Sequence, residues 1–291
     1  MMGDMRFPFL PLFVPADRPE RFGKAAASGA DAVIIDLEDA VAPAAKEAAR
    51  EGLAQGLAGL KPGGTAIYVR LNGADTGYFA DDLAAIATLP LTGIVLPKAE
   101  DPAIIRIARE TLGANGRVIA LLETPLGIVR ARELAQVADR LAFGSLDYAV
   151  AIGARHVRHA LDAARQELVL ASACAGLPGP IDGVTTTYRD EQAVVDDAAY
   201  AADLGFGGKL LIHPAQIAPA IRGFSPTGEE VARAEKILSA LTEREGGAVS
   251  LDGAMVDAPV VKWAQTVKSR ALRLQALQTD GEAGAAARAR S

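Results

Sequence analysis

Short apolar segments alternate with longer amphipathic segments over most of the chain. The short segments are apolar at nearly every position, which is typical of parallel strands covered on both faces. The longer segments have apolar positions at helical spacing, as residues 44–60 do after Pro43, and many end at a glycine. This pattern predicts eight strands, at residues 9–14, 32–36, 66–71, 93–97, 118–123, 140–144, 181–184 and 209–213.

Eight strands, each followed by a helix, predict a closed (β/α)8 TIM barrel of the α/β class. The alternative is a doubly wound open sheet, which more often has a glycine-rich turn after its first strand, whereas residues 14–22 here read VPADRPERF. We interpret residues 228–246 as the last barrel helix and the rest as a C-terminal helical extension. The expected domains are therefore a catalytic barrel, residues 1–245, and an extension, residues 246–291, that packs on a neighbouring subunit.

Composition and charge narrow the function classes. The chain has 291 residues, a net charge of −6 and a pI of about 5.2, so no basic face for nucleic acid is expected. No run approaches the roughly 18 apolar residues of a membrane span, and the first residues lack a signal-peptide pattern. Cys174, the only cysteine, excludes a disulfide framework, and its apolar helical surroundings predict that it is buried. We expect a soluble cytoplasmic protein.

Polar residues stand where the predicted strands end, and the carboxyl ends of barrel strands carry the chemistry of this fold. They are Asp36, Glu38, Asp39, Arg70, Asn72, Lys98, Glu123, Asp147, Asp182 and His213. Each alone has a structural explanation, such as a helix cap or a salt bridge. Glu123 and Asp147 directly follow neighbouring apolar strands, and two carboxylates with open positions between them suit Mg²⁺.

Several stretches in this order resemble the citrate lyase beta-subunit family, within the HpcH/HpaI aldolase group. They are LFVPADRPERFGKAAASGADAVIIDLEDAV, VRLNG, VLPKAE, LLETPLGI, FGSLDYA and KLLIHPAQI, and the resemblance spans residues 10 to 270. It implies a Mg²⁺-dependent enzyme that cleaves a carbon–carbon bond in the thioester of a hydroxy acid.

The resemblance also implies roles for particular residues. Glu123 and Asp147 would hold Mg²⁺, and Arg70 would clamp the carboxylate and oxo group of the substrate. The acids of DLEDAV, which are Asp36, Glu38 and Asp39, would act beside them as partners of metal-bound water and of Arg70.

The resemblance also implies residues that would bind the CoA part of the thioester. Lys24 matches a basic residue near the CoA phosphates. Many members have Arg-Ser where Phe9 and Leu10 stand, and Gly where Ala16 stands; Arg6 is then the candidate for holding the nucleotide part.

Members that act on free CoA thioesters carry a C-terminal extension, here GAMVDAP, that places an aspartate in the neighbouring subunit's site. That role falls on Asp257, and it implies a homo-oligomer, expected as a homotrimer or homohexamer.

The expected reaction splits a 3-hydroxy-dicarboxyl-CoA thioester of malyl, citramalyl or citryl type into acetyl-CoA or propionyl-CoA and a 2-oxo acid. Two alternatives remain. One is a CoA-independent 2-oxo acid aldolase, although such enzymes usually carry a histidine base after an early strand and no histidine precedes His156. The other is a non-catalytic barrel subunit of a lyase complex, against which the presence of all four of Arg70, Glu123, Asp147 and Asp257 argues.

Overall fold

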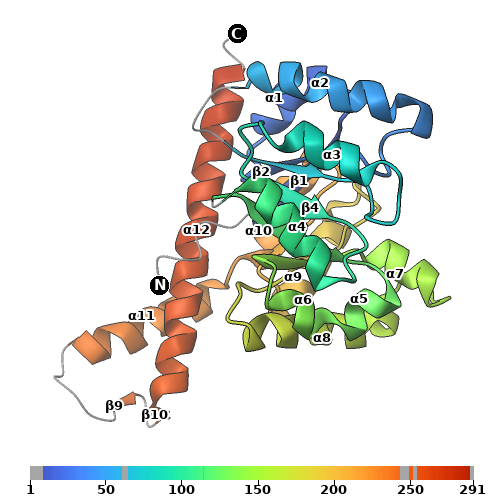
Figure 1. Cartoon of the computed structure of the whole chain (residues 1–291). Helices are drawn as coiled ribbons and strands as arrows, with labels where there is room; N and C mark the ends of the chain where they lie inside the picture. Colours follow the sequence, from blue (N-terminus) through green and yellow to red (C-terminus); the bar gives the residue numbers. More distant parts are fainter. Residues whose placement is uncertain (1–8, 61–64, 114, 243–248, 252–253, 289–291) are drawn as a thin grey trace.

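Eight parallel strands close into a barrel surrounded by helices (Figure 1). The computed structural model describes residues 9–60, 65–113, 115–242, 249–251 and 254–288. The strands follow one another around the barrel in sequence order. The last strand returns to the first, because Leu12 bridges Leu211 in parallel and the Phe13 N–H donates to the Leu211 carbonyl at 2.8 Å. The predicted (β/α)8 barrel is confirmed, and the open doubly wound sheet is excluded.

The strands agree closely with the apolar segments of the sequence. They are β1 (Pro11–Pro15), β2 (Ala32–Asp36), β3 (Ala66–Arg70), β4 (Gly93–Leu96), β5 (Arg117–Leu122), β6 (Arg140–Phe143), β7 (Ile181–Asp182) and β8 (Gly208–Lys209). The last two are shorter than predicted. Near their ends the backbone still pairs through single bonds, as from Leu210 N–H to the Asp182 carbonyl at 2.9 Å.

Helices alternate with the strands and form the outer layer. They are α1 (Phe22–Ala26), α2 (Lys46–Ala58), α3 (Phe79–Ile86), α4 (Pro102–Leu112), α5 (Pro125–Val129), α6 (Ala131–Ala135), α7 (Ser145–Ala151), α8 (Arg158–Cys174), α9 (Glu191–Leu204) and α10 (Ile217–Phe224). Short 3-10 helices η2 (Pro19–Arg21), η3 (Pro43–Ala45) and η4 (Pro214–Gln216) precede α1, α2 and α10. No helix in the described part of the chain is long and apolar enough to cross a membrane.

Two apolar cores explain why the strands are apolar throughout. Ile34, Tyr68 and Leu121 belong to a core inside the barrel. Val33 and Val69, which alternate with such residues along the strands, belong to an outer core between the strands and the helices. Alternate residues of one strand therefore face different cores, and both faces exclude water.

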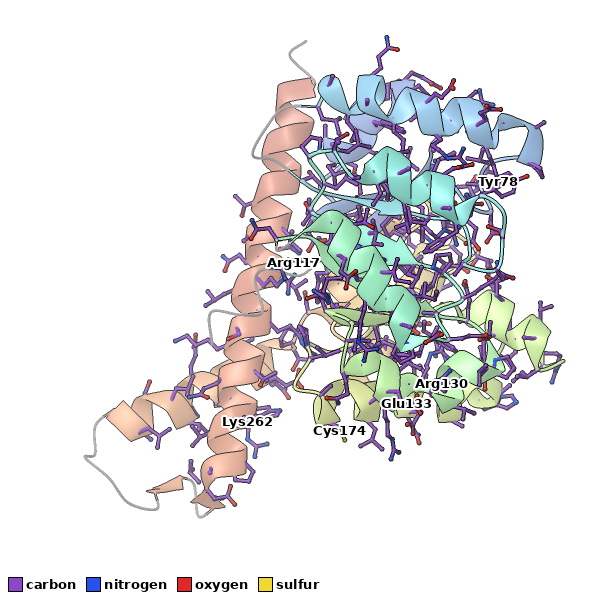
Figure 2. The ribbon with its side chains drawn as sticks, viewed as in Figure 1. Tyr78, Arg117, Arg130, Glu133, Cys174 and Lys262 are labelled. Carbon is purple, nitrogen blue, oxygen red and sulfur yellow. The ribbon has the colours of Figure 1, made fainter. Side chains whose placement is uncertain are left out.

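Cys174 is exposed, so the prediction that it is buried is wrong. Figure 2 shows it at the outer surface. Ala171 and Ser172 are the last residues of the buried face of α8, and the helix ends at Cys174.

The C-terminal part differs from the prediction in one helix. The last helix of the barrel is α10, which packs on α9 and brings Phe224 edge-to-face against Phe9 at 4.8 Å. Residues 228–242 form α11 (Gly228–Thr242), which packs instead against α12 (Ala258–Arg288). Its apolar stripe is buried in a separate small core that includes Ile237, Val256 and Val267.

We call α11, α12 and the antiparallel hairpin β9 (Val249–Leu251) and β10 (Ala254–Val256) the C-terminal unit. The predicted boundary between residues 245 and 246 lies outside the described residues. Further along α12, Leu274 joins the outer core and Arg273 reaches Asp31, just before β2, at 3.4 Å. Since Asp31 also accepts from the Phe9 and Leu10 N–H groups, α12 is fastened to the amino-terminal end of the barrel.

Candidate active site

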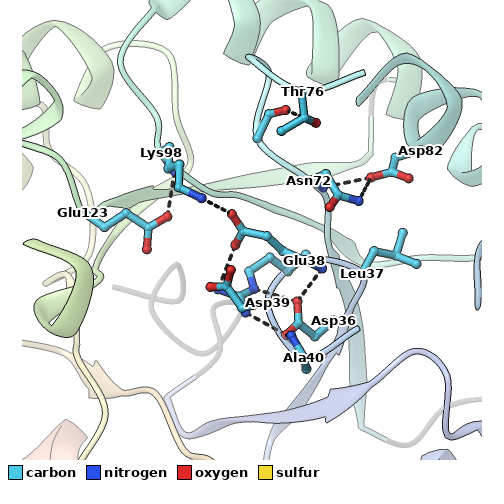
Figure 3. A network of polar contacts seen from close by, with 12 residues as sticks. Asp36, Leu37, Glu38, Asp39, Ala40, Asn72, Thr76, Asp82, Lys98 and Glu123 are labelled. Carbon is cyan, nitrogen blue, oxygen red and sulfur yellow. Dashed lines mark hydrogen bonds and ion pairs between the residues drawn. The ribbon is translucent and has the colours of Figure 1, made fainter. Parts of the chain in front are cut away.

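Charged side chains from consecutive strands meet at the carboxyl end of the barrel (Figure 3). Asp36 ends β2 and Arg70 ends β3, and these two residues are partners in the parallel register. Glu38 lies in the loop after β2, Lys98 follows β4, and Glu123 follows β5. The structure therefore brings together most of the acids and cations that the sequence places at strand ends.

Arg70 and Asp36 form a two-pronged ion pair. Nε and Nη2 of Arg70 each donate to an Asp36 oxygen at 2.7 Å. The same carboxylate also accepts from the N–H groups of Glu38 at 2.9 Å and Ala40 at 3.1 Å, which fixes the loop after β2. Burial alone would lower the pKa of Arg70, but its acidic partners, led by Asp36, outweigh burial and hold that pKa above its ordinary value.

The clamping role implied for Arg70 stays a prediction, and the ion pair with Asp36 limits the donors that Arg70 has left for it. Its fork is directed at Asp36, so Nη1 is the nitrogen that faces the rest of the site. Nη1 lies 3.0 Å from Glu38 Oε2 and 3.5 Å from Asp39 Oδ2. Glu38 is buried, whereas the side chain of Asp39 is 60% exposed and stands at the outer edge of the cluster.

Glu123 is nearly inaccessible to solvent, with 2% of its surface exposed. Its Oε1 accepts from the Lys98 N–H at 2.9 Å. Its Oε2 lies beside Gly144, where a Cβ would come within 2.4 Å of that oxygen. Burial, reinforced by the negative charge of Glu38, raises the pKa of Glu123 to about 8. An ionised carboxylate in such a position needs a cation close by.

Asp147 lies on the same side of the site, after the strand that neighbours β5. It occupies the first turn of α7 and is exposed. It is close enough to Glu123 for its charge to contribute to the raised pKa of that carboxyl. A buried carboxylate with a second, accessible carboxylate nearby is a donor set that fits Mg²⁺, which takes one or two protein carboxylates and keeps other positions for water or substrate.

Lys46 is a buried residue of the site that the sequence reasoning missed. Its Nζ donates to the Leu37 and Glu38 carbonyls at 2.7 Å and to Asn72 Oδ1 at 2.6 Å. Asn72 is held in turn by Asp82, through bonds of 2.8 and 2.7 Å. The spacing of the sequence could have revealed its burial, because Lys46 lies on the same face of α2 as the buried residues Ala49, Leu53 and Leu57.

The remaining candidates lie apart from this cluster. Lys24 is exposed on α1, and Arg6 lies outside the described residues. Asp257 is exposed in front of α12, where its Oδ1 accepts from the Val260 N–H at 3.2 Å. Figure 1 shows the β9–β10 hairpin and the start of α12 projecting from the barrel, so the structure does not bring Asp257 into the site of its own chain.

A barrel with charged groups clustered at the carboxyl end of its strands is the usual architecture of a barrel enzyme. The chain belongs to the HpcH/HpaI aldolase/citrate lyase family, whose model matches residues 10–214.

Individual proteins agree with this assignment. The citrate lyase subunit beta-like protein of Deinococcus radiodurans is 37% identical over 273 residues, covering 89% of this chain and 95% of its own. The mitochondrial citramalyl-CoA lyase of Rattus norvegicus is 30% identical over 291 residues, covering 91% and 86%. A crystal structure of CitE from Mycobacterium tuberculosis, in complex with magnesium, acetoacetate and coenzyme A, superposes with a TM-score of 0.78 at 37% identity and covers 91% of this chain and 99% of its own.

Proposed function

We propose that this chain, a carbon–carbon lyase by family, is a Mg²⁺-dependent acyl-CoA lyase. Its substrate would be a 3-hydroxy-dicarboxyl-CoA thioester of malyl, citramalyl or citryl type, split into acetyl-CoA and a 2-oxo acid. The observation that carries the proposal is the position of Glu123: the side chain is buried, one oxygen is held by the Lys98 N–H, the other lies beside Gly144, and the charge of Asp147 is close enough to raise the pKa of the carboxyl. The relatives named for citramalyl-CoA lyase and the CitE complex with magnesium and coenzyme A support it.

Glu123 and Asp147 are the residues that would hold the metal. When bound, Mg²⁺ would supply a Lewis acid for the substrate hydroxyl, stabilising the alkoxide left when this hydroxyl loses its proton, before that oxygen becomes the carbonyl of the 2-oxo acid and the electron pair of the broken carbon–carbon bond passes to the thioester enolate. Arg70 adds its Nη1 donor on the same side of the site, and Asp36 keeps the guanidinium plane in place. Burial of Arg70 and Glu123 strengthens both contributions, because fewer waters compete for the charges.

Asp257 would complete the site of a neighbouring subunit. A thioester enolate leaves when the bond breaks and must be protonated, and a carboxyl group can relay that proton. We infer that the C-terminal unit of one chain covers the site of the next, within a homotrimer or homohexamer. Val129 on α5, which follows Glu123, and Val150 on α7, which contains Asp147, support this, since they are 78% and 81% exposed. Apolar side chains so exposed are suited to an interface.

The test is a panel of malyl-, β-methylmalyl-, citramalyl- and citryl-CoA with Mg²⁺, with release of the 2-oxo acid followed. We expect release from at least one thioester and none after removal of the metal with a chelator. Glu123→Gln and Asp147→Asn should each lose Mg²⁺ binding, measured by calorimetry, together with activity. Failure of every thioester, or full activity of Glu123→Gln, would refute the proposal.

A further inference from the structure

Lys98 has an unusual backbone conformation directly beside the proposed metal ligand. Its φ of +46° makes it the one non-glycine residue with positive φ in the described part of the chain. A lysine gains nothing locally from the left-handed region, which side chains avoid for steric reasons. Such a conformation persists where the surrounding structure requires it, and it is found most often at functional sites.

The conformation lets one residue contact two acids from different strands. The main-chain N–H of Lys98 donates to Glu123 Oε1 at 2.9 Å, and its Nζ donates to Glu38 Oε1 at 2.6 Å. Figure 3 shows Lys98 between these two carboxylates. The backbone of Lys98 thus holds Glu123, the proposed metal ligand, while its side chain holds Glu38, which is not assigned to the metal.

The charge balance around Glu38 explains why a lysine is needed. Glu38 is buried, and its Oε2 faces Arg70 Nη1 at 3.0 Å. Arg70 lies within 3.5 Å of Asp36, Glu38 and Asp39. The Lys46 ammonium is also near these acids, but it is bound by main-chain carbonyls and Asn72. The Lys98 ammonium adds a positive charge that contacts the Glu38 carboxylate directly, on the oxygen that does not face Arg70. Without it Glu38 would be attracted to a cation held by Glu123, and Arg70 Nη1 would lose the carboxylate that it faces.

We propose that Lys98 is a positioning residue of the lyase: its ammonium keeps Glu38 on Arg70 and away from the metal ligand Glu123, so that Arg70 is oriented for substrate. This inference rests on the proposed function. It makes Lys98 act through Glu38 rather than on the substrate or the metal. It also predicts that kcat falls while Mg²⁺ binding is retained, a separation that a merely structural residue would not produce.

The test compares Lys98→Met, which removes the charge at similar length, with Lys98→Arg, which keeps it. Lys98→Met should lower kcat about 10- to 100-fold, as expected for a misplaced catalytic group, with less change in KM. Calorimetry on the same variant should give a Mg²⁺ Kd that is unchanged or about threefold lower, because a nearby positive charge has been removed. Lys98→Arg should recover most of kcat. A Lys98→Met protein that lost Mg²⁺ binding as well would contradict the proposal.

A double-mutant comparison tests whether Lys98 acts through Glu38. If it does, Lys98→Met combined with Glu38→Gln should be no slower than Glu38→Gln alone. Multiplying effects, or a raised KM at unchanged kcat, would mean that Lys98 contacts the substrate directly and would overturn the proposal. Wild-type protein that releases no 2-oxo acid refutes the lyase function itself; active wild type with an equally active Lys98→Met refutes only the role of Lys98.

Discussion

Gly144 leaves the space in which one oxygen of Glu123 lies. A Cβ at this position would lie 2.3 Å from Glu123 Cβ and 2.4 Å from its Oε2. The φ of Gly144 is −85°, so the requirement is for space and not for an unusual backbone. Because Glu123 is also bound by the Lys98 N–H, its side chain is fixed from two sides.

Gly144→Ala should therefore displace Glu123 and weaken Mg²⁺ binding. We expect activity to fall at least about 10-fold, from misplacement of the ligand, and the free energy of unfolding to fall by about 1–3 kcal/mol from overpacking. Gly52→Ala is the matched control, since nothing lies within 4 Å of its added Cβ and it lies within α2. That substitution should leave activity unchanged and stabilise by about 0.5–1 kcal/mol. Equal Mg²⁺ affinity of Gly144→Ala and wild type, by calorimetry, would contradict this account of Glu123.

At the scale of elements, α2 holds the loop after β2 through Lys46. The ammonium is bound by three oxygens, two of them carbonyls of that loop. Burial lowers the pKa of Lys46 from its ordinary 10.5, although the surrounding acids oppose this shift. The unfolded chain therefore binds this proton more tightly. The contribution of Lys46 to unfolding free energy should rise with pH between its lowered folded-state pKa and about 10.5.

Lys46→Met should remove this pH-dependent rise and lower the free energy of unfolding by about 2–4 kcal/mol, because three buried oxygens lose their donor. Denaturant titrations between pH 7 and the onset of alkaline unfolding would measure both effects. Lys236→Met, at an exposed position on α11, is the control and should stay within about 0.5 kcal/mol of wild type. A similar loss in both variants would contradict the anchoring role of Lys46.

The sequence predicts the strands well because both of their faces are buried, so that apolar runs mark them directly. It also places Glu123 and Arg70 correctly at strand ends. It could not show that the Arg70 fork is taken by Asp36, since that pairing depends on the register between β2 and β3. It wrongly predicted that residues 228–242 form the last barrel helix, for a related reason. The amphipathic pattern of a helix shows that one face is buried but does not show which element covers that face, and here α12 covers it.

At the scale of the whole molecule, two parts of α12 have different surroundings: its middle packs on the barrel and its start projects away from the barrel. Its middle is fastened to the amino-terminal end of the barrel through Arg273 and Leu274. Its start, directly after Asp257, lies in the part of the C-terminal unit that projects from the barrel (Figure 1). A carboxylate presented in this way is accessible to another chain. The proposed role of Asp257 therefore makes catalysis a property of the assembly.

Mixing two inactive variants tests this role. Chains with Glu123→Gln retain Asp257, and chains with Asp257→Ala retain the metal ligands, so a mixed oligomer can contain sites that have both. If each site draws its two parts from two randomly mixed chains, co-expression with two affinity tags and tandem purification should return about a third of wild-type activity for a homotrimer and about a quarter for a homohexamer. Mixing Glu123→Gln with Asp147→Asn is the matched control and should restore nothing, because those residues belong to one site of one chain. Purified mixed oligomers of the first pair without activity, or full activity of Asp257→Ala alone, would refute the shared site.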